Sequence, residues 1–415
     1  MMTDNLNEIG ANAKKAAFQI ANLDTETKNQ VLNEFATALT EHTNEIVTAN
    51  NKDLDNANDL PAKFVDRLKL TPERIDGMAE GLRQVANLAD PIGNVDTGFT
   101  NKDGLIIEQR RVPLGVIAMI FEARPNVSVD ASALTFKSGN AVILRGGKEA
   151  INSNTTLVDI LRTVLNKNGI DENAIQILHD TSHETANELM HLNRYVDVLI
   201  PRGGSGLINA VVQNSTVPVI ETGAGNCHIY VDDSADLKMA TDITVNAKVQ
   251  RPSVCNAAEK LLINADVADE MLPTIAQALE DNGVELRGDD KSRQIVSSIK
   301  PATADDWSTE YNDLIMAVKV VDSVDDAISH INEYSTGHSE SIITNNYAHA
   351  KKFQQLIDSA CVYVNASTRF TDGFEFGFGA EIGISTQKLH ARGPMGLNEI
   401  TTTKYVISGD GQIRK

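Results

Sequence analysis

Strand-like and helix-like segments alternate between residues 140 and 220, and this alternation restricts the folds open to the chain more than any other feature. Short β-branched runs predict the strands, and longer amphipathic runs predict the helices between them. The predicted strands are 140–144, 174–178, 196–201 and 217–220, and the predicted helices are 153–168, 185–192 and 205–213. Such alternation forms βαβ units and therefore a parallel sheet. We predict an α/β fold whose ligand site lies beyond the carboxyl ends of the strands.

The segments on either side suggest how the chain divides into domains. Residues 3–89 have mostly helical periodicity, and a second alternation of strands and helices follows residue 237. We expect one domain over 1–234, with a strand insertion near 105–125, a second over 235–380, and a tail over 381–415. The tail ends in a strand-like run outside the second alternation, which suggests a strand exchanged at a subunit interface.

Two predicted strands end in turns that combine glycine with positive charge. The first contains Arg145, Gly146, Gly147 and Lys148, and the second contains Arg202, Gly203, Gly204 and Ser205. Glycine lets backbone N–H groups approach a phosphate, and the dipole of the following helix favours its negative charge. Neither turn is the G-x-G-x-x-G fingerprint, and such turns can also serve tight geometry alone. A dinucleotide site is the hypothesis that the sheet context favours.

Cys255 lies in the stretch VQRPSVCNAAEKLLI, between a helical run and a strand-like run. Pro252 interrupts the helix, so the thiol should lie on a connection. Arg251 and Lys248 place positive charge nearby, which favours the nucleophilic thiolate. The alternative is a buried, inert cysteine, because cysteine is among the most buried residue types. Glu221, at a strand end, could be a general base, an orienting group or a solvated turn residue.

The composition argues against several classes of partner. With a formal net charge of −20, the chain is a poor match for nucleic acid or an anionic membrane. No apolar run approaches the ~18 residues that span a membrane, and no secretory signal pattern is present, so we expect a cytoplasmic protein. The three cysteines are far apart in sequence, and His179, His183 and His191 do not share a helix face. We therefore predict neither disulfides nor a metal site.

Several long motifs, in order, resemble the aldehyde dehydrogenase superfamily and, within it, the γ-glutamyl phosphate reductases, also called glutamate-5-semialdehyde dehydrogenases. They include VPLGVIAMIFEARPNVSVDA, FKSGNAVILRGGKEA, PRGGSGLI, VIETGAGNCHIYVD, QRPSVCNAAEKLLI and HARGPMGL. The resemblance covers nearly the whole chain. It implies an aldehyde dehydrogenase-like α/β fold with two Rossmann-like domains and a small β oligomerisation element. It also implies NADP bound by the first domain and Cys255 as the nucleophile of the second.

The resemblance also implies roles for further residues. Asn126, in FEARPNVSVD, is the candidate side-chain donor to an oxyanion, beside the backbone N–H of Cys255. Glu221 falls where hydrolytic relatives keep a base that activates water. Arg145 and Lys148 fall where the superfamily contacts the adenosine ribose, and two cations there suit the 2′-phosphate of NADP. The candidate clamps for an anionic substrate are arginines, with Arg124 and Arg369 favoured. The full set is Arg124, Arg251, Arg369 and Arg392.

The activity implied is NADPH-dependent reduction of L-glutamate 5-phosphate to L-glutamate 5-semialdehyde, with release of phosphate through a Cys255 thioester, in proline biosynthesis. The alternatives are an aldehyde-oxidising dehydrogenase that needs no phosphate and uses Glu221 as base, and a nucleotide-binding module without catalysis. The expected assembly is a homo-oligomer, a dimer or a tetramer. Because the acyl phosphate is unstable, a transient complex with the glutamate 5-kinase that makes it is a further hypothesis.

Overall fold

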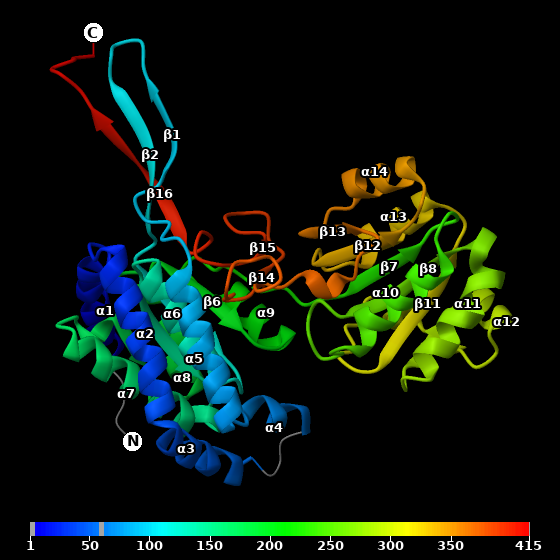
Figure 1. The fold of residues 1–415 in the computed structure, drawn as a ribbon, viewed down its shortest axis with the longest axis horizontal. Helices are drawn as coiled ribbons and strands as arrows, with labels where there is room; N and C mark the ends of the chain where they lie inside the picture. Colours follow the sequence, from blue (N-terminus) through cyan, green and yellow to red (C-terminus); the bar gives the residue numbers. More distant parts are fainter. Residues whose placement is uncertain (1–4, 58–61, 415) are drawn as a thin grey trace. The chain divides into compact units, whose positions relative to one another are not determined.

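The computed structural model describes residues 5–57 and 62–414, which form two compact units (Figure 1). The first unit contains Met1–Glu221, Gly377–Gly383 and Met395–Lys415, and the second contains Thr222–Phe376 and Ile384–Pro394. The expected boundary at 234 therefore moves to 221, because strand β7 (Cys227–Val231) pairs within the second sheet. The expected tail is divided between the two units.

The first unit is built on a four-stranded parallel sheet of order β5-β4-β3-β6. Its strands are β3 (Val116–Phe121), β4 (Ala141–Gly146), β5 (Ile175–Ile177) and β6 (Val198–Arg202). Every residue of β3 and β4 is buried, which is why both strands are continuous apolar runs in the sequence. The parallel sheet is confirmed. The predicted strand over 217–220 forms only a single bridge, between Leu199 and Val219.

Helices pack around this sheet, and five of them precede its first strand. The helices of the first unit are α1 (Leu6–Ile20), α2 (Thr25–Glu41), α3 (Thr43–Asp55), α4 (Ala62–Leu68), α5 (Pro72–Asn87), α6 (Asn126–Lys137), α7 (Ile151–Lys167), α8 (His183–Met190) and α9 (Ser205–Asn214). Phe35 of α2 is fully buried, and its ring centroid lies 5.7 Å from that of Phe136 on α6. The predicted helical layer over 3–89 is confirmed for the described residues.

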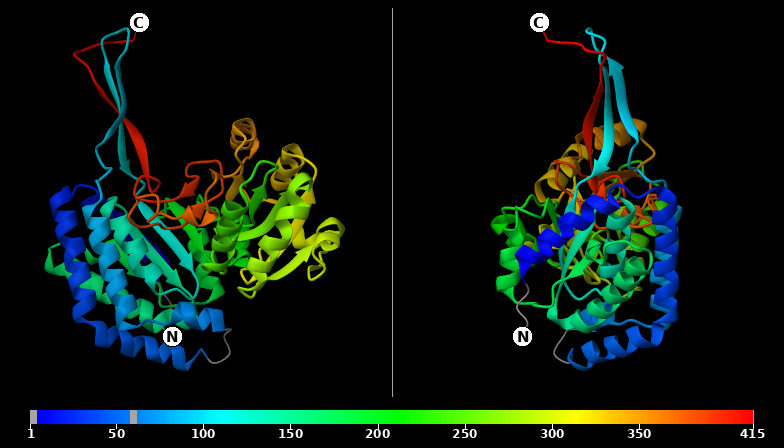
Figure 2. Two further views of the ribbon diagram at one scale, coloured as in Figure 1. Left: turned by 45° about the vertical axis from the view of Figure 1, so that its right-hand side comes forward. Right: turned by 90° about the vertical axis from the view of Figure 1, so that its left-hand side faces the viewer.

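Three antiparallel strands form a separate sheet, which we call the arm. They are β1 (Val95–Thr100), β2 (Ile106–Pro113) and β16 (Thr401–Ser408), in the order β1-β2-β16, and they lie side by side in both views of Figure 2. The predicted insertion is thus only partly right, since β2 belongs to the arm and β3 to the central sheet. The terminal strand is present and pairs with β2 of the same chain. The expected exchange of this strand at a subunit interface stays a prediction.

The second unit contains a seven-stranded parallel sheet of order β10-β9-β11-β8-β7-β12-β13. Its remaining strands are β8 (Ala258–Asn264), β9 (Glu285–Gly288), β10 (Lys300–Pro301), β11 (Ile315–Val321), β12 (Ser339–Ile343) and β13 (Cys361–Val364). Its helices are α10 (Leu237–Val249), α11 (Ala265–Glu280), α12 (Asp290–Ile295), α13 (Val324–Tyr334) and α14 (Tyr347–Leu356). The second α/β unit is therefore confirmed.

Both faces of this second sheet are buried. Along β8, Leu261 and Ile263 belong to one hydrophobic cluster and Leu262 belongs to another, because successive side chains of a strand point to opposite faces. A short antiparallel pair, β14 (Ile384–Ser385) with β15 (Gly393–Pro394), completes the unit. No helix in the described part of the chain has the length and apolar character needed to cross a membrane.

Candidate active site

The two glycine-containing turns meet at one edge of the first sheet. Phe121, the last residue of β3, pairs with Gly146 on one side and with Arg202 on the other. Because the strands are parallel, their carboxyl ends lie at the same edge, where α/β sheets bind ligands. The chain therefore has one continuous candidate ligand edge in the first unit.

In the first turn, Arg145 and Lys148 have different surroundings. Arg145 is only 9% exposed, and its Nη2 donates to the carbonyl oxygens of Thr181 and Ser182, at 2.5 and 3.0 Å. Burial lowers the pKa of this guanidinium, although nearby acids such as Glu149 oppose the shift. Its Nε is buried without a hydrogen-bond partner among the described residues. Lys148 is exposed, so it presents the accessible cation of the pair.

Side chains pack closely against the glycines of the first turn. A Cβ at Gly146 would lie 2.2 Å from Nδ2 of Asn154, and a Cβ at Gly147 would lie 2.2 Å from Oε1 of Glu149. Glu149 also accepts a hydrogen bond from the backbone N–H of Ala123, at 2.9 Å. Tight geometry, which the sequence left open as an alternative for this turn, is therefore part of the reason for its glycines.

The second turn already holds a carboxylate of the protein. Oε2 of Glu122 accepts a hydrogen bond from the backbone N–H of Gly204, at 2.9 Å, and a Cβ at Gly203 would lie 2.5 Å from the same oxygen. The N-terminus of α9 thus attracts negative charge, as a helix dipole should. Arg202 lies 3.8 Å from Glu381. Ser205 begins α9, but its side chain lies outside the described residues.

A strained turn joins β3 to α6. Ala123 has φ of 27°, a conformation that side chains other than glycine rarely adopt. Arg124 is half-buried, and exposed Asn126 begins α6. The side-chain amide of Asn126 donates to Oδ2 of Asp130, at 2.9 Å. Burial raises the pKa of Asp130 to about 6, against the effect of this hydrogen bond. Asp130 was not predicted, although its spacing of four residues from Asn126 on a helix could have indicated the pair.

Cys255 lies on the connection between α10 and β8, as predicted, and is half-buried. The next residue, Asn256, fixes this connection. Its Nδ2 donates to the carbonyl of Thr371 at 2.8 Å, and its own carbonyl accepts from Thr368 Oγ1 at 2.7 Å. Arg369 donates to Oδ1 of Asn256 through Nη1 and to Gln250 through Nε. The structure thus brings Arg369 to the Cys255 connection, through an asparagine that the sequence analysis missed.

The cations of the Cys255 connection have different surroundings. Lys248 is fully buried, and its Nζ lies 2.8 Å from Oε2 of Glu259, which is also fully buried. Lys248 is therefore paired with Glu259. The expectation that Lys248 supports the thiolate of Cys255 stays a prediction. Burial is the main cause that lowers the pKa of Arg369, and the positive charge of Arg251 lowers this pKa further. Nearby negative groups, among them Cys255, raise it. Arg369 therefore interacts electrostatically with both Arg251 and Cys255 at this connection.

Arg392 and Glu221 occupy other surroundings. Arg392 donates from Nη2 to both the carbonyl and Oδ1 of Asp358, each at 2.9 Å, so its guanidinium is held by an ion pair. Glu221 is half-buried and ends the first of the three segments that make up the first unit. The roles assigned to both residues from the sequence stay predictions.

One group of described residues has geometry that could hold a metal ion, namely Asp232, Asp233 and His349, whose ligand atoms lie within 4.8 Å of one another. Both oxygens of Asp232 already accept hydrogen bonds, including one from Tyr230 and one from Thr344. The histidines that the sequence analysis considered are not part of this group. We assign this group no role.

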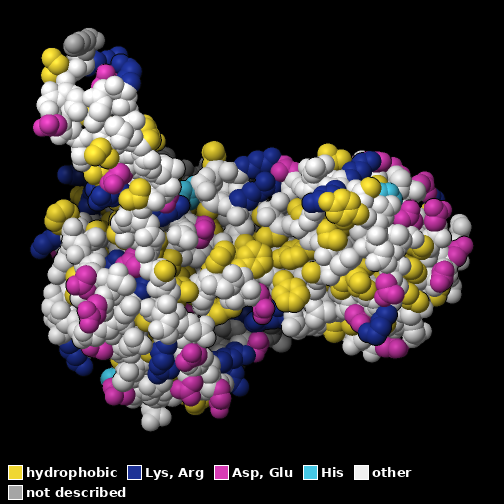
Figure 3. All heavy atoms as spheres, turned by 45° about the horizontal axis from the view of Figure 1, so that its top comes forward, with side chains coloured by type: hydrophobic (Ala, Val, Ile, Leu, Met, Phe, Trp, Pro, Cys, Tyr) yellow, Lys and Arg dark blue, Asp and Glu magenta, His cyan; other side chains and the backbone are white. Residues whose placement is uncertain are grey.

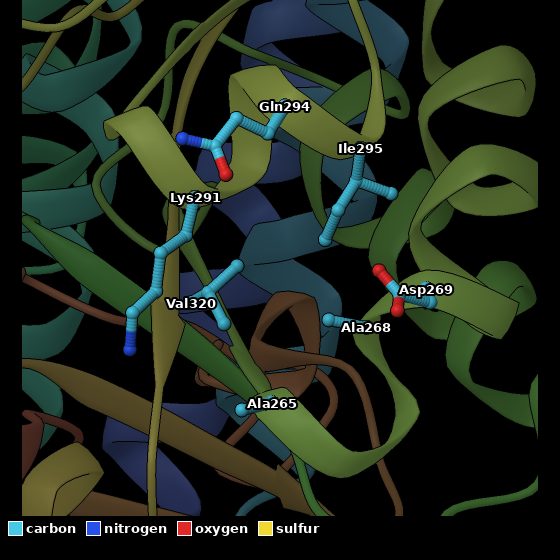
Figure 4. A pocket seen from close by; sticks show the side chains of 7 residues that line it. All are labelled: Ala265, Ala268, Asp269, Lys291, Gln294, Ile295 and Val320. Carbon is cyan, nitrogen blue, oxygen red and sulfur yellow. The ribbon is translucent and has the colours of Figure 1, made fainter.

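A surface pocket of about 310 Å³ lies within the second unit, between α11, α12 and β11 (Figure 4). Its lining residues are Ala265, Ala268, Asp269, Lys291, Gln294, Ile295 and Val320. The charged group of Lys291 is paired with Asp322 at 2.6 Å. None of the predicted site residues lines this pocket, so it is separate from the chemistry considered above.

The model of the aldehyde dehydrogenase family matches residues 2–313 and 307–406. The chain belongs to the aldehyde dehydrogenase family. Among curated members, γ-glutamyl phosphate reductase of Limosilactobacillus reuteri strain DSM 20016 is 64% identical over 414 residues, covering 100% of both chains. The enzyme of that name from Lactiplantibacillus plantarum is 64% identical over 409 residues, covering 99% of each. The resemblance inferred from the motifs is confirmed.

Solved structures of the family agree with this fold. The crystal structure of γ-glutamyl phosphate reductase from Thermotoga maritima matches with a TM-score of 0.97 at 50% identity, covering 99% of this chain and 100% of that one. An engineered glycolyl-CoA reductase with bound NADP+ matches with a TM-score of 0.72 at 17% identity, covering 98% of this chain and 97% of that one, which shows the shared fold. The predicted aldehyde dehydrogenase-like fold is confirmed.

The raised pKa of Asp130 predicts a pH-dependent effect on stability. The pKa of Asp130 is about 6 in the folded state, above the ordinary value of 3.8. The contribution of Asp130 to the free energy of unfolding is therefore full below pH 3.8 and is lost as the pH rises through 6. Asp130→Asn should therefore raise the free energy of unfolding by about 1–3 kcal/mol at neutral pH and by much less near pH 4.5. Urea unfolding at the two pH values measures this difference.

Asp159→Asn, at an exposed position of α7, is the matched control and should change the free energy of unfolding by less than about 0.5 kcal/mol at either pH. An Asp130→Asn effect of the same size at both pH values would show that Asp130 is not the titrating group.

Proposed function

We propose that this protein is an oxidoreductase that reduces L-glutamate 5-phosphate to L-glutamate 5-semialdehyde with NADPH, releasing phosphate, in proline biosynthesis. The similarity to γ-glutamyl phosphate reductases over the whole chain supports this assignment. The observation that carries it is the Cys255 connection, where a half-buried thiol lies on a loop fixed by Asn256 and Arg369. A loop thiol beside cations has the surroundings of a nucleophile.

Cys255 begins the reaction by attacking the acyl carbon of the substrate as a thiolate. A carbon–sulfur bond forms, the bond to the phosphate oxygen breaks, and phosphate leaves with the electron pair, which gives a thioester. An acyl phosphate is already activated, so this displacement needs no acid. Arg251 and Arg369 are the proposed partners of the anionic groups of the substrate, because a guanidinium matches both carboxylate and phosphate. Arg124 and Arg392 are retained as further candidates.

The reduction step needs a hydride, and it also needs hydrogen-bond donors that stabilise an oxyanion. The backbone N–H of Cys255 and the side-chain amide of Asn126 are the proposed donors, and the hydrogen bond to Asp130 would fix the orientation of that amide. Bound NADPH would supply the hydride. Cleavage of the carbon–sulfur bond then releases the aldehyde and restores the Cys255 thiol. Glu221 has no required role in this scheme, because water activation would divert the thioester.

The carboxyl edge of the first sheet is the proposed NADP site. The buried Nε of Arg145, which lacks a hydrogen-bond partner among the described residues, and the exposed Lys148 fit an anionic ligand there. Lys148 would pair with the 2′-phosphate, and Arg145, Gly146 and Gly147 would shape the turn. The start of α9, formed by Arg202, Gly203, Gly204 and Ser205, would face the pyrophosphate.

Replacing the nucleophile tests the covalent scheme. Cys255→Ser should lower the rate of NADPH oxidation with L-glutamate 5-phosphate by at least about 1000-fold, because a serine hydroxyl is a far weaker nucleophile than a thiolate. NADPH binding, measured by titration calorimetry, should not change. Cys361→Ser, which changes a buried cysteine of the same unit, is the control and should retain turnover. Undiminished turnover in Cys255→Ser would contradict covalent catalysis.

The choice of cofactor depends on Lys148. Lys148→Ala should raise the KM for NADPH by about ten- to a hundredfold, the range expected for a hydrogen-bonded charge pair, and should change the KM for NADH little. Steady-state kinetics with both cofactors measure this. Lys167→Ala, at an exposed position near the end of α7, should change neither value. An equal effect of Lys148→Ala on both cofactors would contradict recognition of the 2′-phosphate.

We further propose that the arm assembles the protein into a homo-oligomer, a dimer or a tetramer. Its exposed hydrophobic side chains include Phe99, Ile106, Tyr405 and Ile407, which are 53–64% exposed, and Figure 3 shows hydrophobic side chains among charged ones on the arm. Apolar residues on edge strands favour pairing with another chain. Light scattering tests this, and a monomer at micromolar concentration would contradict it.

The location in the cell and the kinase partner remain proposals drawn from chemistry. A strongly acidic protein with three free cysteines and an NADPH-dependent reaction fits the cytoplasm. A transient complex with glutamate 5-kinase would protect the unstable acyl phosphate. A coupled assay tests this, and a rate equal to that of free diffusion would count against the complex.

A further inference from the structure

The backbone of Gly225 lies directly against the peptide of Cys255. A Cβ placed on Gly225 would lie 1.4 Å from the carbonyl oxygen of Cys255, 2.3 Å from its carbonyl carbon and 2.7 Å from its Cα. These contacts are with backbone, so no side-chain rotation could relieve them. Any residue larger than glycine at 225 must displace Cys255 or the segment that contains Gly225.

The thiol of Cys227 holds the same carbonyl. Its Sγ donates to the carbonyl oxygen of Cys255 at 3.2 Å, and Cys227 is fully buried. Burial raises the pKa of this thiol well above its ordinary value, so it keeps the proton that it donates. The register of β7 against β8 shifts between Cys227 and His228. A register shift of this kind changes the direction of a side chain. Here it lies at the start of β7, opposite the start of β8 and next to the Cys255 connection.

The segment that contains Gly225 is held in place by hydrogen bonds of its own. Oε1 of Glu310 accepts from the backbone N–H of Gly225, at 2.8 Å. The side-chain amide of Asn226, which is fully buried, donates to the carbonyls of Trp307 and Tyr334, at 2.9 and 2.8 Å. Oδ1 of Asn226 has no hydrogen-bond partner among the described residues, so the two bonds of its Nδ2 and the bond of the Gly225 N–H hold the segment. Breaking hydrogen bonds of buried groups is costly. The segment therefore acts as a fixed support, which we call the cradle and define as residues 225–227.

We propose that Gly225 and Cys227 are positioning residues that hold the backbone of Cys255 in the place from which its thiolate attacks. This inference rests on the proposed function, in which Cys255 is the nucleophile. Misplacing a reacting group by about 1 Å can lower the rate a hundredfold. Because Gly225 and Cys227 both contact the Cys255 carbonyl, they should keep the rate high by fixing the position of this residue. Neither residue contacts the substrate in this scheme, so a substitution at either residue should change kcat and leave KM unchanged.

A series of substitutions at Cys227 tests the cradle. Cys227→Ala removes the donor and should lower kcat about fivefold, the effect of one neutral hydrogen bond, with both KM values unchanged. Cys227→Ser restores a donor and should return kcat to within about twofold of the original value. The rate of iodoacetamide reaction at Cys255, followed by peptide mass spectrometry without substrate, should fall in Cys227→Ala and recover in Cys227→Ser.

Cys361→Ala is the matched control, since it removes a buried thiol of the same sheet whose hydrogen bond is to Thr371. It should leave kcat and the iodoacetamide reaction unchanged. If Cys227→Ala matches this control in both measurements, or if Cys227→Ser behaves like Cys227→Ala, the cradle is overturned. Turnover that survives Cys255→Ser would instead overturn the proposed function, while the iodoacetamide reaction would still report on the position of Cys255.

Gly225→Ala tests the steric half of the inference. The new methyl group must displace the Cys255 carbonyl, so kcat should fall about a hundredfold while NADPH binding is retained. An unchanged kcat would overturn the role of Gly225. If this variant does not fold, the Cys227 series decides the proposal alone.

Discussion

Parallel strands buried on both faces leave a chain few places for chemistry, and the two parallel sheets of this protein are built in that way. In such a sheet every apolar side chain is used for packing, so reactive groups gather on the connections at the strand ends. The first unit places two glycine turns around the end of β3. The second places Cys255 on the connection that precedes β8. The remaining features of the candidate site depend on how these connections are held.

Buried polar contacts hold them. Asn256 ties the Cys255 connection to Thr368 and Arg369, and the Glu259–Lys248 pair anchors the ends of β8 and α10. A buried group that loses its partner costs about 1–3 kcal/mol, more if it is charged, so these contacts resist local rearrangement. The same principle operates in the first unit, where Glu122 neutralises the N-terminus of α9 and Glu149 supports strained Ala123.

The sequence predicted what depends on local pattern. Most strands of the two parallel sheets, the helical layer and the connection that contains Cys255 follow from periodicity and from Pro252, whereas the short strands β9 and β10 were not predicted. Partners distant in the chain could not be predicted in this way: β16 pairs with β2 across nearly the whole sequence, and Gln109 bonds Thr403, 294 residues away. Lys248 was expected to place positive charge near Cys255, and its pairing with Glu259 was not predicted because Glu259 lies on another element. Gly225 could not be singled out from the sequence, since its contact with Cys255 exists only in the folded chain.

The reverse reaction tests the central claim most directly, because it shows what resolves the Cys255 thioester. Reduction of NADP+ would be followed with L-glutamate 5-semialdehyde, in the presence and in the absence of inorganic phosphate. The account predicts that turnover requires phosphate, since phosphate must attack the thioester to form the acyl phosphate. Equal rates without phosphate would mean that water resolves the thioester, and a hydrolytic dehydrogenase with Glu221 as base would then replace the reductase.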